Sequence, residues 1–142
     1  MGKFDLLLLP YLSGMATQLI KFINSLIKER EMNFKKLIEM GGIPSTHSAA
    51  SVTLTTLIGI REGLFSVFFA LSLFLTIFIM IEATGIRRIA GRHAVAINRI
   101  VKSQPDSDTY YGNLLVPVGH TPFEVLVGSV FGFLFAFAFG GI

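Results

Sequence analysis

Residues 41–48 of the chain read Gly-Gly-Ile-Pro-Ser-Thr-His-Ser, and the rest of the molecule is organised around this stretch. The glycines and the proline end one segment, and hydroxyl residues then open a long apolar run, which is typical of a helix N-terminus. Such a terminus presents free backbone N–H groups and a partial positive charge, so it is a natural anion site. Residues 119–124, Gly-His-Thr-Pro-Phe-Glu, have the same design. We therefore expect two helix starts to face each other across one phosphate site.

The composition is that of a membrane protein. The chain has 142 residues, of which 52% are hydrophobic and 15% are charged, whereas soluble domains carry about 25% charged residues. Cysteine is absent, which excludes disulfides and thiolate metal sites. The net charge of +3 fits loops that face anionic lipid headgroups. It is weak evidence for nucleic acid, and we expect no nucleic-acid partner because no binding motif is present.

The apolar pattern predicts an all-α membrane protein with a single domain over residues 1–142. Four transmembrane helices are predicted at about residues 5–27, 45–60, 63–83 and 122–140, joined in part by a tight polar turn at 61–62. Residues 86–104 are predicted to form an amphipathic interfacial helix, because apolar residues recur at helical spacing opposite a basic face.

Small and charged residues within these spans suggest how the helices pack. Lys21 is the one charge between residues 6 and 27, and we expect it to extend toward the interface near its helix end. Hydroxyl residues after residue 45 share one helix face, a pattern typical of helix contacts in membranes. Gly128 and Gly132 form a G-x-x-x-G spacing, which indicates close helix packing or self-association.

The spacing of the four spans also predicts an orientation. The connectors at 28–44 and 85–120 lie on the same side of the membrane, and they hold nine of the twelve lysines and arginines. The positive-inside rule then places both histidine motifs at the cytoplasmic face of the cell membrane, in a multi-pass protein. Basic residues recruited to bind phosphate would produce the same count, so that alternative stays open.

His47, His120 and Glu124 form the candidate catalytic set. Phosphoryl transfer needs a nucleophile, an acid for the leaving oxygen and positive charge around the phosphoryl oxygens. Histidine serves either of the first two roles because its pKa lies near working pH. Glu124 follows His120 by four residues and can orient it. The alternative for residues 121–124 is purely structural, since they fit a capping box with proline at the first helical position.

Several motifs resemble those of a known family. Pro-Ser-Thr-His at 44–47 resembles the Pro-Ser-Gly-His motif of the type 2 phosphatidic acid phosphatase superfamily, which includes lipid phosphatases and vanadium-dependent haloperoxidases. His-Thr-Pro-Phe-Glu at 120–124 resembles its His-x-x-x-Asp motif, with Glu in place of Asp. Together with Glu-Ala-Thr-Gly-Ile-Arg-Arg at 82–88, the two motifs are similar to the small divergent membrane branch of that superfamily, over residues 41 to about 128.

The resemblance implies a phosphoric ester hydrolase that uses neither metal nor cofactor. By position, His120 is the nucleophile that forms a phosphohistidine, Glu124 orients it and His47 is the general acid. Ser45 and the backbone of Thr46 would hold phosphoryl oxygens. The superfamily has an arginine six residues before the nucleophile, and that position is Leu114 here. The candidates for the missing positive charge are Arg87, Arg88, Lys35 and Lys36.

The expected partner is a phosphorylated membrane lipid, such as phosphatidate, phosphatidylglycerophosphate or a polyprenyl (di)phosphate. The main alternative is a non-catalytic lipid-phosphate-binding or assembly protein that kept the anion site, which the missing arginine favours. Another alternative is a metal site made of His47, His120 and Glu124, although neither histidine belongs to a known metal-ligand spacing. Four short spans make a small bundle, for which we expect a homodimer.

Overall fold

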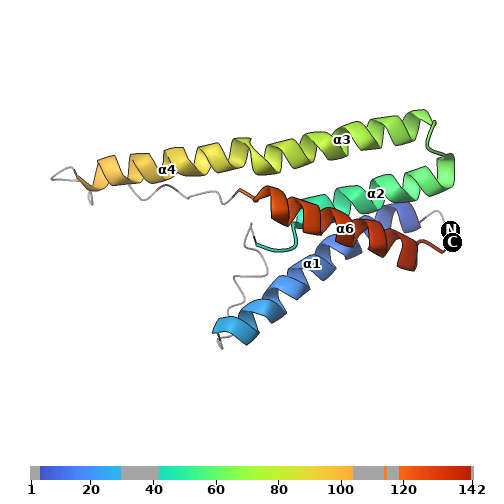
Figure 1. The fold of residues 1–142 in the computed structure, drawn as a ribbon, viewed down its shortest axis with the longest axis horizontal. Coiled ribbons are helices and arrows are strands. Elements are labelled where there is room, and N and C mark those ends of the chain that lie inside the picture. Colours follow the sequence, from blue (N-terminus) through green and yellow to red (C-terminus); the bar gives the residue numbers. More distant parts are fainter. Residues whose placement is uncertain (1–3, 30–41, 104–113, 115–118, 142) are drawn as a thin grey trace.

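The structure is a computed structural model, and it describes residues 4–29, 42–103, 114 and 119–141. These residues form helices α1 (Asp5–Glu29), α2 (Thr46–Glu62), α3 (Val67–Thr84), α4 (Ile86–Lys102) and α6 (Pro122–Phe139), with no strand among them. The predicted all-α class is confirmed. Helices α1, α2, α3 and α6 form a bundle, and α4 leaves it in the direction of α3 (Figure 1).

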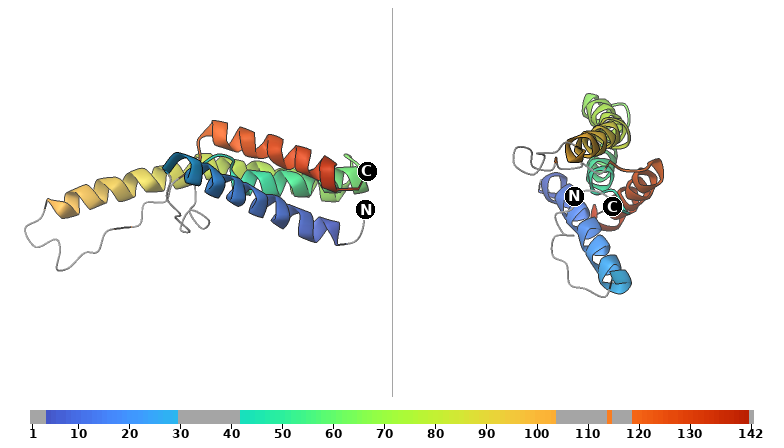
Figure 2. Two further views of the ribbon diagram at one scale, coloured as in Figure 1. Left: turned by 90° about the horizontal axis from the view of Figure 1, so that it is seen from below. Right: turned by 90° about the vertical axis from the view of Figure 1, so that its left-hand side faces the viewer.

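Helix α2 is the centre of the bundle. It contacts α1, α3 and α6, whereas α1 and α3 make no contact with each other in the described parts of the chain. Figure 2 shows this arrangement along the bundle axis, with α2 in the middle and α1, α3 and α6 around it. Because α2 and α6 both run away from the end where α1 finishes, their N-termini lie together at that end (Figure 1).

The interior is small and polar, and the exterior is large and apolar. The fully buried side chains include Ser13, Thr17, Thr53 and Leu57, whereas most phenylalanines of α3 and α6 are exposed. The Thr53 hydroxyl lies 2.9 Å from Ser13 Oγ on α1 and 3.0 Å from the Gly132 carbonyl oxygen on α6. Hydrogen bonds between hydroxyl groups and their partners therefore join the helices. In a membrane, apolar side chains gain little by moving from lipid into a helix contact, so other interactions have to hold the helices together.

Two glycines allow α2 and α6 to touch backbone to backbone. A methyl group added at Gly128 would collide with the backbone of Ser45, and one added at Gly132 would collide with the backbone of Ala49. The predicted close packing at this G-x-x-x-G spacing is confirmed, and it occurs between helices of one chain. The start of α2 is thereby held against the first three turns of α6.

Three stretches of the described chain are long and apolar enough to cross a membrane: Asp5–Ile27, Val67–Lys102 and Pro122–Phe139. Helix α2 corresponds to the span predicted at 45–60, and its 17 residues measure about 26 Å. Helix α2 contacts three other helices, and its Thr53 and Thr55 hydroxyl groups bond to them and need not face lipid.

One predicted boundary differs from the structure. The span predicted at 63–83 begins only at Val67, and the predicted turn at 61–62 is the last turn of α2. Gly63 ends α2 with φ of 88°, a left-handed conformation that suits glycine, and the Ser66 side chain then caps α3 by accepting from Phe69 N. The position of α4 in the membrane interface stays a prediction.

Candidate active site

The two helix starts bring His47 and His120 together at one end of the bundle. His47 lies in the first turn of α2, and His120 lies two residues before α6. Their ring centroids are 6.3 Å apart, with the ring planes at 68° to each other. His120 is only 3% exposed, whereas His47 is an exposed residue. A group of the size of a phosphate that enters from the exposed side of His47 could therefore contact both rings.

His120 is held by a carboxylate and by the neighbouring helix. Its Nδ1 lies 2.8 Å from Glu124 Oε2, and its backbone N–H donates to the Ala83 carbonyl oxygen at 2.9 Å. An ionised carboxylate only accepts hydrogen bonds, so a neutral imidazole at this position carries its proton on Nδ1. The Nε2 lone pair is then available for attack on an electrophile.

The same Glu124 carboxylate also caps α6. Its Oε2 accepts from the Thr121 backbone N–H at 3.3 Å, and the Thr121 hydroxyl accepts from the Glu124 backbone N–H at 3.3 Å. This is the capping box predicted from the sequence, with Pro122 at the start of the helix. The structural and orienting roles of Glu124 therefore coexist in one side chain.

Ser45 connects the two motifs through its backbone and caps α2 with its side chain. Its backbone N–H donates to the Glu124 carbonyl oxygen at 3.1 Å. Its hydroxyl oxygen accepts from Ser48 N at 3.4 Å and lies 3.0 Å from Ser48 Oγ. Ser45 is fully buried, so its hydroxyl is committed to the helix start. Its use as a phosphate ligand stays a prediction.

Thr46 lies at the meeting point of α1 and α2, where the structure adds a residue that sequence reasoning missed. Lys21 of α1 donates from Nζ to Thr46 Oγ1 at 3.0 Å, and the Thr17 hydroxyl lies at the same distance from that oxygen. The ammonium group is thus placed beside the first turn of α2, next to the histidine pair.

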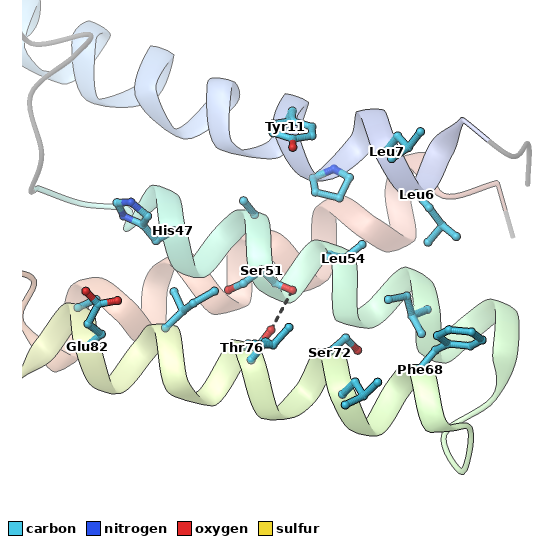
Figure 3. Close-up of a pocket in the computed structure, with 17 residues that line it drawn as sticks. Leu6, Leu7, Tyr11, His47, Ser51, Leu54, Phe68, Ser72, Thr76 and Glu82 are labelled. Atoms are coloured by element: carbon cyan, nitrogen blue, oxygen red, sulfur yellow. Dashed lines mark hydrogen bonds between the residues drawn. The ribbon is translucent and has the colours of Figure 1, made fainter.

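An apolar cavity of about 680 Å³ opens from the histidine end of the bundle. It lies over α2, between α1 and α3, and both His47 and Glu82 line it (Figure 3). Its opposite end is lined by Leu6 and Phe68. His47 therefore belongs both to the histidine pair and to this cavity.

The comparison with known families bears on both the motifs and the fold. A family model described as the Divergent PAP2 family matches residues 3–135. The chain belongs to the Divergent PAP2 family.

A relative in Bacillus subtilis (strain 168) is named "Uncharacterized membrane protein YuiD". This Divergent PAP2 chain is 34% identical to it over 141 residues, which cover 88% of the chain and 89% of the relative. No solved structure matches. Family membership, the named relative and the candidate spans together identify a multi-pass membrane protein.

The structure places only some of the basic residues predicted for this Divergent PAP2 site. Arg87 and Arg88 lie in the first turn of α4, just beyond Glu82, while their side chains fall outside the described parts. Lys35 and Lys36 also lie outside the described residues. Their roles as phosphate ligands stay predictions, and Lys21 is the lysine that the structure places against the motif.

Leu114 occupies the position where the superfamily motif has an arginine. Its backbone N–H donates to Asn98 Oδ1 at 2.9 Å, and its carbonyl oxygen accepts from Asn98 Nδ2 at 3.0 Å. This paired contact ties Leu114 to α4. Among the residues that the structure describes, no group of three histidine, cysteine or acidic side chains could hold a metal ion.

Proposed function

We propose that this Divergent PAP2 protein is a membrane lipid phosphate phosphatase that works without a metal through a phosphohistidine on His120. The observation that carries the proposal is the pair of buried His120 and partly buried Glu124, with 2.8 Å between Nδ1 and Oε2, beside a second histidine. This is the arrangement of an activated nucleophile: a base within hydrogen-bond reach that orients it and a separate acid for the leaving group.

In the first half-reaction, the Nε2 lone pair of His120 attacks the phosphorus of the lipid phosphate. The bond between phosphorus and the lipid oxygen breaks, and protonated His47 gives its proton to that oxygen. The products are the lipid alcohol and the phosphohistidine. Glu124 stabilises the positive charge that develops on the His120 ring, because it accepts the Nδ1 hydrogen bond.

In the second half-reaction, water attacks the phosphorus of the phosphohistidine. Neutral His47 takes a proton from that water, and the bond between phosphorus and Nε2 breaks. Inorganic phosphate leaves, and both histidines return to their starting states. His47 serves as acid in the first step and as base in the second, which histidine can do because its pKa lies near neutrality.

Lys21 and the first turn of α2 supply positive charge in this proposal. The backbone N–H groups of Thr46 and His47, in the first turn of α2, lie at the positive end of the helix dipole. Lys21 adds a full charge next to them, through its contact with Thr46. The predicted ligands Arg87, Arg88, Lys35 and Lys36 remain candidates for the outer part of the site.

We therefore expect the change Lys21→Met to weaken phosphate handling without removing the chemistry. Hydrogen bonds to charged groups contribute about 1.5–3 kcal/mol, so kcat/KM for a lipid phosphate should fall roughly 10- to 100-fold. The fall should be smaller in Lys21→Arg, which keeps the charge. Lys102→Met removes an exposed lysine at the far end of α4 and is the matched control. Equal activity of Lys21→Met and Lys102→Met would remove Lys21 from the site.

The substrate class in the proposal is a phosphorylated membrane lipid, such as phosphatidate, phosphatidylglycerophosphate or a polyprenyl (di)phosphate. The site lies at the end of the bundle where α2 and α6 begin. We infer from the basic connectors that this end of the bundle faces the cytoplasm, with the protein in the cell membrane. We also propose that the protein is a homodimer.

A binding protein without turnover is the second candidate, and Leu114 is the observation that favours it. With leucine at this position, one cation that the superfamily motif supplies to the phosphoryl group is missing. Such a protein would bind phosphate or vanadate at the same helix starts and hydrolyse no lipid.

The test is phosphate release from a panel of lipid phosphates by the purified protein in detergent. We expect release from at least one lipid, at the same rate with and without excess chelator. We also expect transient radiolabel on the protein when the lipid phosphate is labelled, in an adduct that survives alkali and is lost in acid, as for a phosphohistidine. Saturable binding of phosphate or vanadate with no release from any lipid would instead select the binding protein.

A further inference from the structure

The cavity over α2 has the form of an open groove that begins at the histidine pair. Its walls are α1 and α3, which do not touch each other in the described parts, and its floor is α2. Both walls belong to stretches apolar enough to cross a membrane, Asp5–Ile27 and Val67–Lys102. The gap between them therefore opens into the hydrocarbon of the bilayer, and the molecules available to fill it from the side are lipids.

The side chains that line the groove favour a hydrocarbon occupant along most of its length. Its serine and threonine hydroxyl groups are already bonded within the protein. Ser51 Oγ and Ser72 Oγ donate to backbone carbonyl oxygens of their own helices at 3.3 and 2.9 Å, and Thr76 Oγ1 lies 2.8 Å from Thr55 Oγ1. The remaining lining is mostly leucine, isoleucine, alanine and phenylalanine. His47 and Glu82 both lie at one end of it, and Tyr11 lines it between the two ends (Figure 3). An amphiphile with its polar group at that end would match this distribution.

The length of the groove corresponds to one leaflet. His47 and Ile58 line it at its two ends on α2, and eleven residues of helix measure about 16 Å. The hydrocarbon core of a bilayer is about 30 Å thick, so one leaflet is about half of that. A lipid with its phosphate at His47 would reach the Phe68 end with the tail of one chain.

The direction of the groove also agrees with the proposed chemistry. In phosphoryl transfer the attacking and leaving atoms lie roughly in line on opposite sides of phosphorus. His120 does not line the groove, whereas His47 does, and the ring centroids are 6.3 Å apart. A phosphate between the two rings would have its nucleophile on the α6 side and its ester oxygen on the groove side, next to the acid.

We propose that the groove between α1 and α3 holds one hydrocarbon chain of the lipid whose phosphate lies between His47 and His120, and that this lipid enters sideways from the bilayer. This inference rests on the proposed function, because it places the phosphate at the histidine pair. To the proposed function it adds the residues that bind the hydrocarbon chain and the route by which the lipid enters. It also specifies that the protein recognises one hydrocarbon chain. A second chain, where the lipid has one, stays in the bilayer.

A fluorescence experiment tests the groove independently of turnover. The chain has no tryptophan, so Phe68→Trp introduces a single reporter at the far end of the groove. Phe78→Trp is the matched control, because Phe78 is also an exposed phenylalanine of α3 and does not line the groove. The probe is dodecyl phosphate brominated at the end of its chain, added to protein in detergent.

We expect saturable quenching of Phe68→Trp that unbrominated dodecyl phosphate reverses and brominated dodecanol does not produce. Phe78→Trp should show only weak quenching without saturation. Equal quenching of the two variants, or equal quenching by the alcohol, would overturn the groove assignment. Specific quenching in a protein that hydrolyses no ester would support the groove and reject catalysis, so the two proposals fail separately.

A blocking variant extends the test to catalysis. Leu75→Trp fills part of the groove from α3, whereas Leu134→Trp places the same bulk on a similarly exposed position of α6 outside it. We expect Leu75→Trp to lower the ratio of kcat/KM for dodecyl phosphate to that for butyl phosphate roughly tenfold or more. Leu134→Trp should leave the ratio unchanged. An unchanged ratio in Leu75→Trp would count against chain binding in the groove.

Discussion

Replacing His120 with alanine is expected to remove phosphate release, with kcat lower by roughly 10⁴-fold or more, because the proposed nucleophile is lost. The radiolabelled protein adduct should disappear with it. The measurement is phosphate release from the preferred lipid phosphate at saturating concentration, together with the alkali-stable label after rapid quenching.

The third histidine of the chain provides the control. His93 is exposed on α4, away from the bundle, so His93→Ala should keep the activity of the unmodified protein. If His120→Ala releases phosphate as fast as His93→Ala, the phosphohistidine mechanism is wrong. A label that persists in His120→Ala would move the nucleophile to another residue.

The change Glu124→Gln is expected to lower kcat about 10²- to 10⁴-fold while α6 stays capped. Glutamine at this position of a capping box can still accept from the first backbone N–H groups, so the helix start is retained. It cannot carry the negative charge that stabilises the imidazolium, and its amide can hydrogen-bond His120 in the wrong tautomer. Steady-state kinetics and thermal unfolding in detergent, measured together, separate the two roles of this side chain.

Thr121→Val gives the complementary variant. It removes the hydroxyl that accepts from Glu124 N and leaves the carboxylate in place, so it should cost about 0.5–2 kcal/mol of stability. Most of the activity should remain. If Thr121→Val and Glu124→Gln lose activity to the same extent, capping alone explains Glu124, and its role toward His120 has to be abandoned.

Local sequence signals predicted the elements that build the site. The hydroxyl residue before each apolar run marks the start of α2 and of α6, and Pro122 with Glu124 identifies the capping box. These signals act over three or four residues, where hydrogen-bond geometry leaves little choice. The close helix packing at Gly128 and Gly132 was predicted for the same reason, since their spacing puts both on one helix face.

The contact made by Lys21 could not be predicted from such local signals. A single lysine in a 22-residue apolar span is evidence for function, because charge inside a membrane is costly. Its position near the helix end allowed a simpler explanation, namely extension of the side chain toward the interface. The contact with Thr46 depends on how α1 crosses α2, and that crossing is set by buried hydroxyls such as Thr17 and Thr53 whose partners are distant in the sequence.

The α3 boundary was mispredicted for a different reason. Residues 63–66 are mostly apolar, so the hydropathy of the span extends through them without a break. The end of α2 depends on the left-handed conformation of Gly63 and on the Ser66 cap. In lipid, apolar composition shows that a segment is buried in the bilayer, but it does not show where its helix begins.

The glycine contact between α2 and α6 has a consequence for how the site responds to its surroundings. Bilayers differ in thickness, and membrane helices adapt to the difference by tilting or shifting. Helices separated by long side chains can adapt by changing rotamers, whereas Gly128 and Gly132 leave no such layer between these two backbones. The helices that carry the two histidines must then tilt as one unit. The distance between His47 and His120 therefore stays the same when the membrane thickness changes.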